Sequence, residues 1–205
     1  MRLYFKPGAC SLASRIVLIE LGQAFEAIRV DTDAGLTEDG RDYRAVNPRG
    51  YVPALELKNG RVVTENPAVL QYLADLQPDR LAPAAGSWDR VRLQEALSFI
   101  SSELHKAFSP FFHGEAQGER RAPAEALLKR RLGEVEQMLG QESPYLLGDR
   151  MSVADIYLFV VLNWTGFIGF SLQGWPRLYD FMSRMGAHAS VRTALLQEGL
   201  LKDAA

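Results

Sequence analysis

The single cysteine of the chain, Cys10, follows a short apolar segment and a Pro7-Gly8 turn, where an amphipathic helix is expected to begin. Amides at a helix N-terminus have no partner within the helix, and the helix dipole is positive there. Such a place favours the thiolate of a cysteine, or binds a thiolate that a ligand brings. A lone cysteine is more often only a small buried hydrophobic residue. Its position at a helix start favours the chemical interpretation.

A second candidate element is the Val52-Pro53 dipeptide, which precedes a predicted hairpin. An X-Pro bond there is usually only a turn, but a cis bond would leave the Val52 amide and carbonyl free to pair with an extended peptide. The run Cys10-Ser11-Leu12-Ala13 contains no second cysteine. Any thiol redox cycle therefore needs a thiol from outside the chain.

The third element is Glu65-Asn66-Pro67. Asn66 is predicted to be an N-cap and Pro67 the first residue of a helix, which is an ordinary way to start one. Free amides at Asn66 would also accept a ligand carboxylate, while Glu65 would hold an ammonium group. A ligand with an amino-acid head and an extended, thiol-bearing peptide suits all three elements.

The elements that must position these residues follow from the hydrophobic period. Asn59-Gly60 predicts a type I′ turn between two strands, since both residues tolerate a positive φ. A short helix is expected inside the long segment before Gly50. The first part of the chain is predicted to contain strands at 3–6 and 25–31, a hairpin of 54–58 and 61–64, and helices at 11–21, around 39–45 and from 66. This order indicates a mixed four-stranded sheet with helices on its faces, a thioredoxin-like α/β domain.

Proline and glycine interrupt the pattern at residues 77–87, which places a domain boundary there and predicts domains 1–80 and 87–205. The second domain is predicted to be all-α. Its expected helices are 88 to about 112, 124–139, 152 to about 167, 175–185 and 191–196. Ser152 and Asp155 form an acidic capping box, which is a folding motif and not a chemical one.

Composition excludes several classes of protein. The 205 residues carry 23 Lys and Arg against 25 Asp and Glu, so the net charge of −2 offers no field for nucleic acid or a membrane surface. One cysteine allows no internal disulfide. No signal peptide or spanning segment is expected, so the chain is predicted to be cytoplasmic. His105, His113 and His188 have no partners at metal-ligand spacing, and no metal is expected.

Taken together, these motifs resemble the cytosolic glutathione transferases, and in particular their bacterial beta class. The resemblance spans nearly the whole chain in the right order. It is carried by residues 6–13 (KPGACSLA), 47–55 (NPRGYVPAL), 64–65 (TE), 71–75 (QYLAD), 102–106 (SELHK) and 152–155 (SVAD). It implies a thioredoxin-like domain that binds glutathione, followed by an all-helical domain that carries a hydrophobic acceptor site, in a homodimer with one glutathione per subunit between the domains.

The resemblance also implies site residues. Cys10 would lie beside the glutathione sulfur, where a mixed disulfide can form, Val52 would pair with the cysteinyl part, and Glu65 with Asn66 would hold the γ-glutamyl head. Cys10 and His105 are the expected catalytic residues. Ser98 and His105 would approach the thiol, and Ser102 and Glu103 would reach the glutathione of the partner subunit. The full expected glutathione-binding set is Ala9, Cys10, Tyr51, Val52, Pro53, Glu65, Asn66, Ser98, Ser102, Glu103 and His105.

Three positions depart from the family pattern. Gly35 stands where related chains place a lysine for the glycyl carboxylate. Tyr4-Phe5 reverses a Phe-Tyr order, and Asn66 replaces a serine or glycine.

The resulting prediction is a detoxifying glutathione transferase whose bound thiolate attacks a hydrophobic electrophile. Aromatic residues are candidates for lining the acceptor pocket, namely Phe108, Phe111, Phe112 and Trp164. Two alternatives stay open: glutathione-dependent redox or reductive dehalogenation through a Cys10 mixed disulfide, and a non-catalytic glutathione-binding protein.

Overall fold

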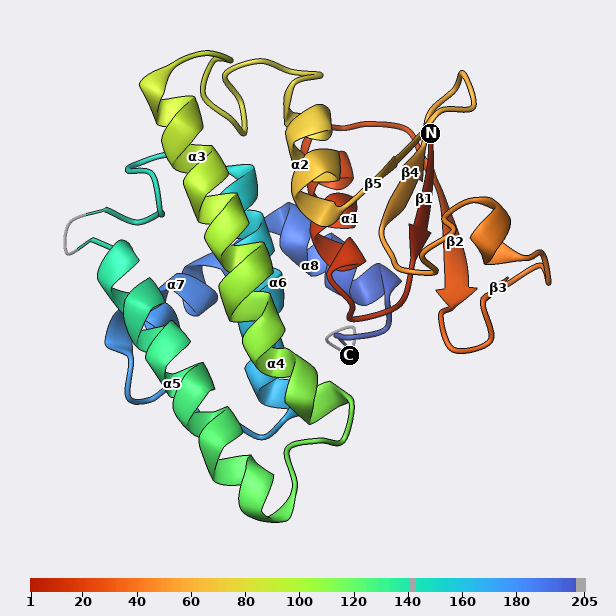
Figure 1. Ribbon diagram of the computed structural model, residues 1–205. Helices are drawn as coiled ribbons and strands as arrows, with labels where there is room; N and C mark the ends of the chain where they lie inside the picture. Colours follow the sequence, from red (N-terminus) through yellow and green to blue (C-terminus); the bar gives the residue numbers. More distant parts are fainter. Residues whose placement is uncertain (141–142, 202–205) are drawn as a thin grey trace. The chain divides into compact units, whose positions relative to one another are not determined.

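The computed structural model describes residues 1–140 and 143–201, which form two compact units (Figure 1). The first unit joins Met1–Arg80 to the segment that begins at Gly186, and the second is Leu81–Met185. The sequence-based division placed everything after residue 87 in one helical domain. In the structure, the C-terminal helix groups with the first unit because it packs against the helix that follows Cys10.

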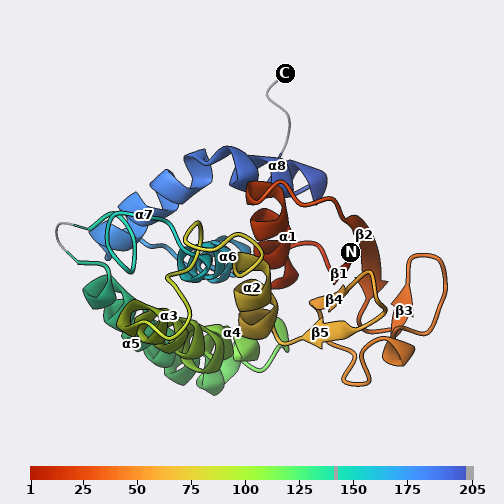
Figure 2. The same ribbon diagram turned by 90° about the horizontal axis from the view of Figure 1, so that it is seen from above.

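The first unit is built on a five-stranded sheet (Figure 2). Its strands are β1 (Arg2–Phe5), β2 (Glu26–Asp31), β3 (Leu36–Thr37), β4 (Ala54–Glu56) and β5 (Val62–Thr64), in the order β3-β2-β1-β4-β5. The central strand β1 runs parallel to β2 and antiparallel to β4, so Leu3 and Tyr4 are fully buried. The prediction of four strands was wrong, since β3 is too short to show an alternating pattern.

Three helices complete the first unit: α1 (Ser11–Glu20), α2 (Asn66–Ala74) and α8 (Ala189–Gln197). Helix α1 contacts both α2 and α8 and is buried along most of its length, including Ser14 and Arg15. The helix expected around 39–45 is only a single 3₁₀ turn, η1 (Tyr43–Ala45). Asp42 caps this turn by accepting a hydrogen bond from the Arg44 amide at 2.9 Å.

The hairpin between β4 and β5 forms as predicted, but not with a type I′ turn. Only Gly60 has a positive φ, at 80°, and Asn59 does not. The Gly60 amide donates to the Leu57 carbonyl at 3.0 Å, and the Leu57 amide donates to the Arg61 carbonyl at 2.8 Å. This is a type I turn followed by a left-handed glycine. The Asn59 side chain favours it because Oδ1 accepts from the Arg61 amide at 3.1 Å.

The second unit is helical. The predicted single helix over 88–112 is interrupted, since a π-helical turn separates its two halves. The elements are α3 (Trp88–Phe99), the π turn η2 (Ile100–Leu104), α4 (His105–Phe112), the 3₁₀ turn η3 (Gly118–Arg120), α5 (Arg121–Met138), α6 (Val153–Phe167) and α7 (Pro176–Ala187). In the part of the chain that the structure describes, no helix combines the length and apolar character needed to cross a membrane.

Helix α6 begins with the predicted capping box, which is confirmed. The Asp155 carboxylate is fully buried and accepts three hydrogen bonds, from the Ser152 amide at 2.8 Å, the Ser152 hydroxyl at 2.7 Å and the Leu146 amide at 2.8 Å. Burial raises the pKa of Asp155. The motif therefore caps the helix start and also binds the 143–151 segment through the Leu146 amide. The sequence of the motif did not indicate this second contact.

Candidate functional site

Cys10 immediately precedes α1, as predicted, and its Sγ lies 3.4 Å from the Val52 carbonyl oxygen. The amides of Cys10 and Ser11 lower the pKa of the thiol, but burial outweighs them and raises it to about 12, with a smaller rise from Glu65. The raised pKa favours the protonated thiol of Cys10 in the free protein and gives little support to a Cys10 thiolate. What remains is the other interpretation, in which the helix start binds a thiolate brought by a ligand.

The segment before Val52 is held firmly by the η1 turn. The Tyr51 carbonyl accepts hydrogen bonds from the Tyr43 hydroxyl at 2.8 Å and from Asn47 Nδ2 at 2.7 Å. The Val52–Pro53 bond is cis and Pro53 is buried, whereas the Tyr51 side chain is 72% exposed. Val52 is half-buried beside Cys10, and Ala9, also half-buried, precedes that cysteine in the chain. The structure thus brings Cys10 and Val52 together, as the sequence predicted.

Glu65 and Asn66 lie where β5 passes into α2. Glu65 occupies the left-handed region with φ at 65°, unusual for a residue other than glycine, and is the cap of α2. Asn66 is the first helical residue and not the cap, which corrects the prediction. Its Oδ1 accepts from the Ser14 hydroxyl at 3.0 Å, and its buried Nδ2 has no protein partner within the described residues. Glu65 is exposed and pairs with Arg49 at 3.4 Å.

Sequence reasoning missed Arg44, whose guanidinium occupies the space beside Gly35. A Cβ at Gly35, where φ is 71°, would lie 3.0 Å from Arg44 Nη1, and one at Gly50 would lie 4.0 Å from Arg44 Nε. Among residues 1–140 and 143–201 the guanidinium has no ion pair or hydrogen bond. The glycine at position 35, where the family resemblance implies a lysine, was the available signal, because it leaves room for a side chain from elsewhere.

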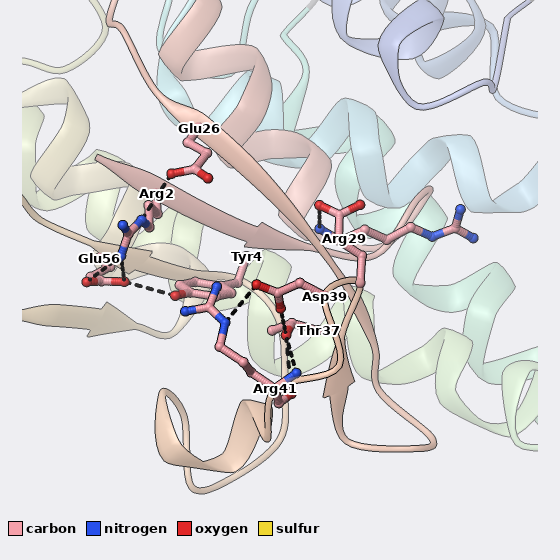
Figure 3. A network of polar contacts seen from close by, with 9 residues as sticks. Arg2, Tyr4, Glu26, Arg29, Thr37, Asp39, Arg41 and Glu56 are labelled. Carbon is pink, nitrogen blue, oxygen red and sulfur yellow. Dashed lines mark hydrogen bonds and ion pairs between the residues drawn. The ribbon is translucent and has the colours of Figure 1, made fainter.

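The Tyr4 hydroxyl belongs to a separate polar network on the sheet (Figure 3). It donates to Glu56 at 2.9 Å, and Arg2 bridges Glu56 and Glu26. Burial, followed by the hydrogen bond to Glu56, raises the pKa of Tyr4. Arg41 in the same network pairs with Asp39 at 2.8 Å. The reversed Tyr4-Phe5 order thus puts the hydroxyl in a structural contact.

In the second unit, His105 starts α4 directly after the π turn. Its Nδ1 lies 2.8 Å from the Tyr157 hydroxyl, and its ring meets Trp164 edge to face at 4.6 Å between centroids. Burial, with a smaller effect of Lys106, lowers the pKa of His105 to about 4. The imidazole is therefore neutral at physiological pH. Tyr157 was not predicted, because a tyrosine in an apolar helix gives no local sign of its partner.

The other predicted residues of the second unit already have partners within it. Ser102 donates to the Ser98 carbonyl at 2.9 Å, and both serines are exposed. Glu103 forms an ion pair with Arg131 of α5. Of the predicted pocket aromatics, Phe108 and Trp164 are buried, whereas Phe112 is 48% exposed and packs against Trp164 at 5.4 Å. Only part of this aromatic group can meet a ligand.

We expect the His105 ring to titrate near pH 4, well below the ordinary value of about 6.5. Since the unfolded chain binds the proton more tightly, the free energy of unfolding should fall as the pH drops through the interval between these values. Proton NMR of the ring, with His105→Phe to assign the signal, measures the pKa. A midpoint at pH 6 or above would contradict the half-buried, neutral imidazole.

Comparison with known proteins identifies the family. Family models for the glutathione S-transferase N-terminal and C-terminal domains match residues 8–76 and 99–189. Glutathione S-transferase GstA of Escherichia coli O157:H7 is 44% identical over 98% of this chain and all of its own length. Two solved structures are each 44% identical to this chain, and each alignment covers 98% of this chain and all of the other. One is the bacterial beta class glutathione S-transferase of Sphingomonas chungbukensis, with a TM-score of 0.93. The other is a sphingomonad glutathione S-transferase complexed with glutathione, with a TM-score of 0.92. The chain belongs to the glutathione S-transferase family and is similar to its bacterial beta class.

Proposed function

We propose that the chain binds glutathione at the start of α1, lowers the pKa of its thiol and directs the thiolate at a hydrophobic electrophile. The observation that carries the proposal is the place of the Cys10 sulfur, which lies 3.4 Å from the Val52 carbonyl oxygen and on which the Cys10 and Ser11 amides act. These amides act on a sulfur at this place, and each pH unit of lowered thiol pKa is worth about 1.4 kcal/mol of preference for the anion.

In the reaction with an aryl or alkyl halide, the glutathione sulfur forms the new carbon–sulfur bond. The halide leaves with the electron pair of the bond that breaks, and the thiol proton passes to solvent before the attack. No oxidant or reductant is needed. The chain contributes a site that holds the sulfur as an anion and fixes its position.

The amino-acid head of glutathione fits Glu65 and Asn66. Thr64 pairs with Ala54, so the start of α2 follows the strand end beside Pro53. The exposed Glu65 carboxylate would take the ammonium group, and the backbone amide of Asn66 at the start of α2 would donate to the head carboxylate. A cysteinyl residue paired with Val52 would then have its amino side directed toward α2.

Antiparallel pairing with Val52 sends the following glycyl residue in the opposite direction, toward Tyr51 and Gly50. The Arg44 guanidinium lies beside Gly50 without a protein partner in the described chain. We assign the glycyl carboxylate to Arg44, whose guanidinium offers a fork of donors beside Gly35, the position where the resemblance implies a lysine.

Replacing Arg44 with glutamine should weaken glutathione binding about tenfold, since a hydrogen bond to a charged group is worth about 1.5–3 kcal/mol. Glutathione esterified at its glycyl carboxylate should bind wild type and variant equally, and calorimetry with both ligands measures the difference. Arg41→Gln is the matched control, because Arg41 already pairs with Asp39. Equal losses for both ligands in Arg44→Gln would contradict the assignment.

The activity itself is tested with glutathione and a chloronitroarene. Thioether and chloride should appear at equal rates, faster than without protein. Retention of glutathione without turnover of any electrophile would favour the non-catalytic alternative. The redox alternative has less support, because burial keeps Cys10 protonated in the free protein.

We also propose that two copies of the chain associate. A groove of about 620 Å³ in the second unit is lined by α3, the end of α5 and the 146–147 segment, with Val91 and Met138 partly exposed in it. Light scattering should give twice the 22.8 kDa mass of one chain. A monomer at micromolar concentration would reject this assembly. A cytoplasmic location remains a prediction from the single free cysteine.

A further inference from the structure

Glu198 at the end of α8 makes a long-range contact with the turn that precedes Cys10. Its Oε2 accepts a hydrogen bond from the Gly8 amide at 2.9 Å, across 190 positions of sequence. Its Oε1 lies 3.0 Å from Arg15 Nε of α1, and the side chains are 0% and 5% exposed. Burial raises the pKa of Glu198 and lowers that of Arg15. Arg15 and Glu198 thus form a buried ion pair.

The turn that Glu198 reaches sets the start of α1. Gly8 has a φ of 73°, and the Ala9 amide closes the turn on the Lys6 carbonyl at 3.0 Å. On the other side, the Ser11 hydroxyl lies 3.3 Å from both the Lys6 amide and its carbonyl. The turn is thus held between α1 and α8, two residues before the cysteine.

The Arg15 side chain is also held by residues next to this turn and next to Glu198. Its guanidinium lies 4.1 Å above the Phe5 ring at the end of β1, and Nη1 donates to Gln197 of α8 at 3.1 Å. A buried ion pair is expensive to desolvate, and an apolar pair of the same volume often stabilises a protein equally well. What an apolar pair does not provide is an acceptor for the Gly8 amide.

We infer that Glu198 is a positioning residue for the thiol site: its carboxylate fixes Gly8 and thereby the Cys10 and Ser11 amides that face the bound sulfur. The inference rests on the proposed function, because it concerns how strongly that site favours a thiolate. If the turn shifts, these amides no longer point at the sulfur, and the thiol of bound glutathione becomes less acidic.

Two double variants isolate the acceptor. Both replace Arg15 with methionine, so neither contains a buried charge at this place. Glu198→Gln then keeps an oxygen that can accept from Gly8, while Glu198→Leu fills similar space without one. The measured quantity is the pKa of the glutathione thiol in the complex, followed by thiolate absorbance, together with the affinity for S-methylglutathione and the melting temperature.

The double variant with Glu198→Gln should keep the thiol pKa of the wild-type complex. The double variant with Glu198→Leu should raise this pKa by about one unit, which is a tenfold loss of thiolate at a pH below the pKa. Affinity for S-methylglutathione should change less than threefold in both. Gln197→Ala, which removes only the other α8 contact of Arg15, is the control and should leave the thiol pKa unchanged. Equal thiol pKa values in the two double variants, whatever their melting temperatures, would overturn the inference. A wild-type complex whose thiol pKa is not lowered would instead reject the proposed function.

Discussion

Replacing Asp155 with alanine is expected to lower the free energy of unfolding by about 4 kcal/mol. The substitution strands three donors, the amides of Ser152 and Leu146 and the Ser152 hydroxyl, around a fully buried position. A buried donor without a partner costs about 1–3 kcal/mol. Urea unfolding followed by circular dichroism measures the change.

Two variants show where the loss originates. Ser152→Ala removes the cap hydroxyl alone and should cost about 1 kcal/mol. Asp155→Asn keeps the size of the side chain but turns one acceptor into a donor, so its loss should lie between the other two. A loss below about 1 kcal/mol in Asp155→Ala would mean that the 143–151 segment and the helix start do not depend on this carboxylate.

Cys10→Ala should abolish covalent exchange with glutathione disulfide while conjugation falls less than about tenfold. Exchange needs the Cys10 sulfur to attack the disulfide and release one glutathione thiolate, and the chain has no other cysteine. Conjugation uses the ligand's own sulfur and the amides of residues 10 and 11, which the substitution keeps. Burial raises the pKa of the free Cys10 thiol to about 12, so the thiolate fraction at neutral pH is small and exchange by the wild type should be slow but measurable.

Mass spectrometry after incubation with glutathione disulfide reads the first reaction, and initial rates with a chloronitroarene read the second. Cys10→Ser controls for the loss of volume, since it fills nearly the same space with a hydroxyl. A fall in conjugation of more than a hundredfold in both variants would contradict this prediction and make Cys10 itself part of the conjugation chemistry.

Local signals explain which parts of the fold could be predicted. The capping box of Ser152 and Asp155 and the helix start after Cys10 depend on neighbours in sequence, and the structure has both. Strand β3 has two residues and so shows no pattern. The π turn at Ile100–Leu104 keeps an apolar spacing that also fits an ordinary helix. Both features depend on packing against residues elsewhere in the chain, and no local sequence pattern identifies those residues.

The candidate site also contains features that local sequence could predict and features that it could not. The contact between Cys10 and Val52 could be expected from two motifs, but the protonation of Cys10 depends on its burial, a property of the whole unit. Arg44 reaches Gly35 from nine residues away, and Glu198 reaches Gly8 from the far end of the chain. No spacing rule connects such pairs, because the fold alone brings them together.

The proposed site stands or falls with the acidity of the bound glutathione thiol. In the Cys10→Ala protein only the ligand contributes a thiol, so thiolate absorbance against pH reports its pKa without interference. We expect a midpoint at least about one pH unit below the ordinary cysteine pKa of about 8.5. A midpoint equal to that of free glutathione, in a complex shown by calorimetry to be saturated, would contradict it.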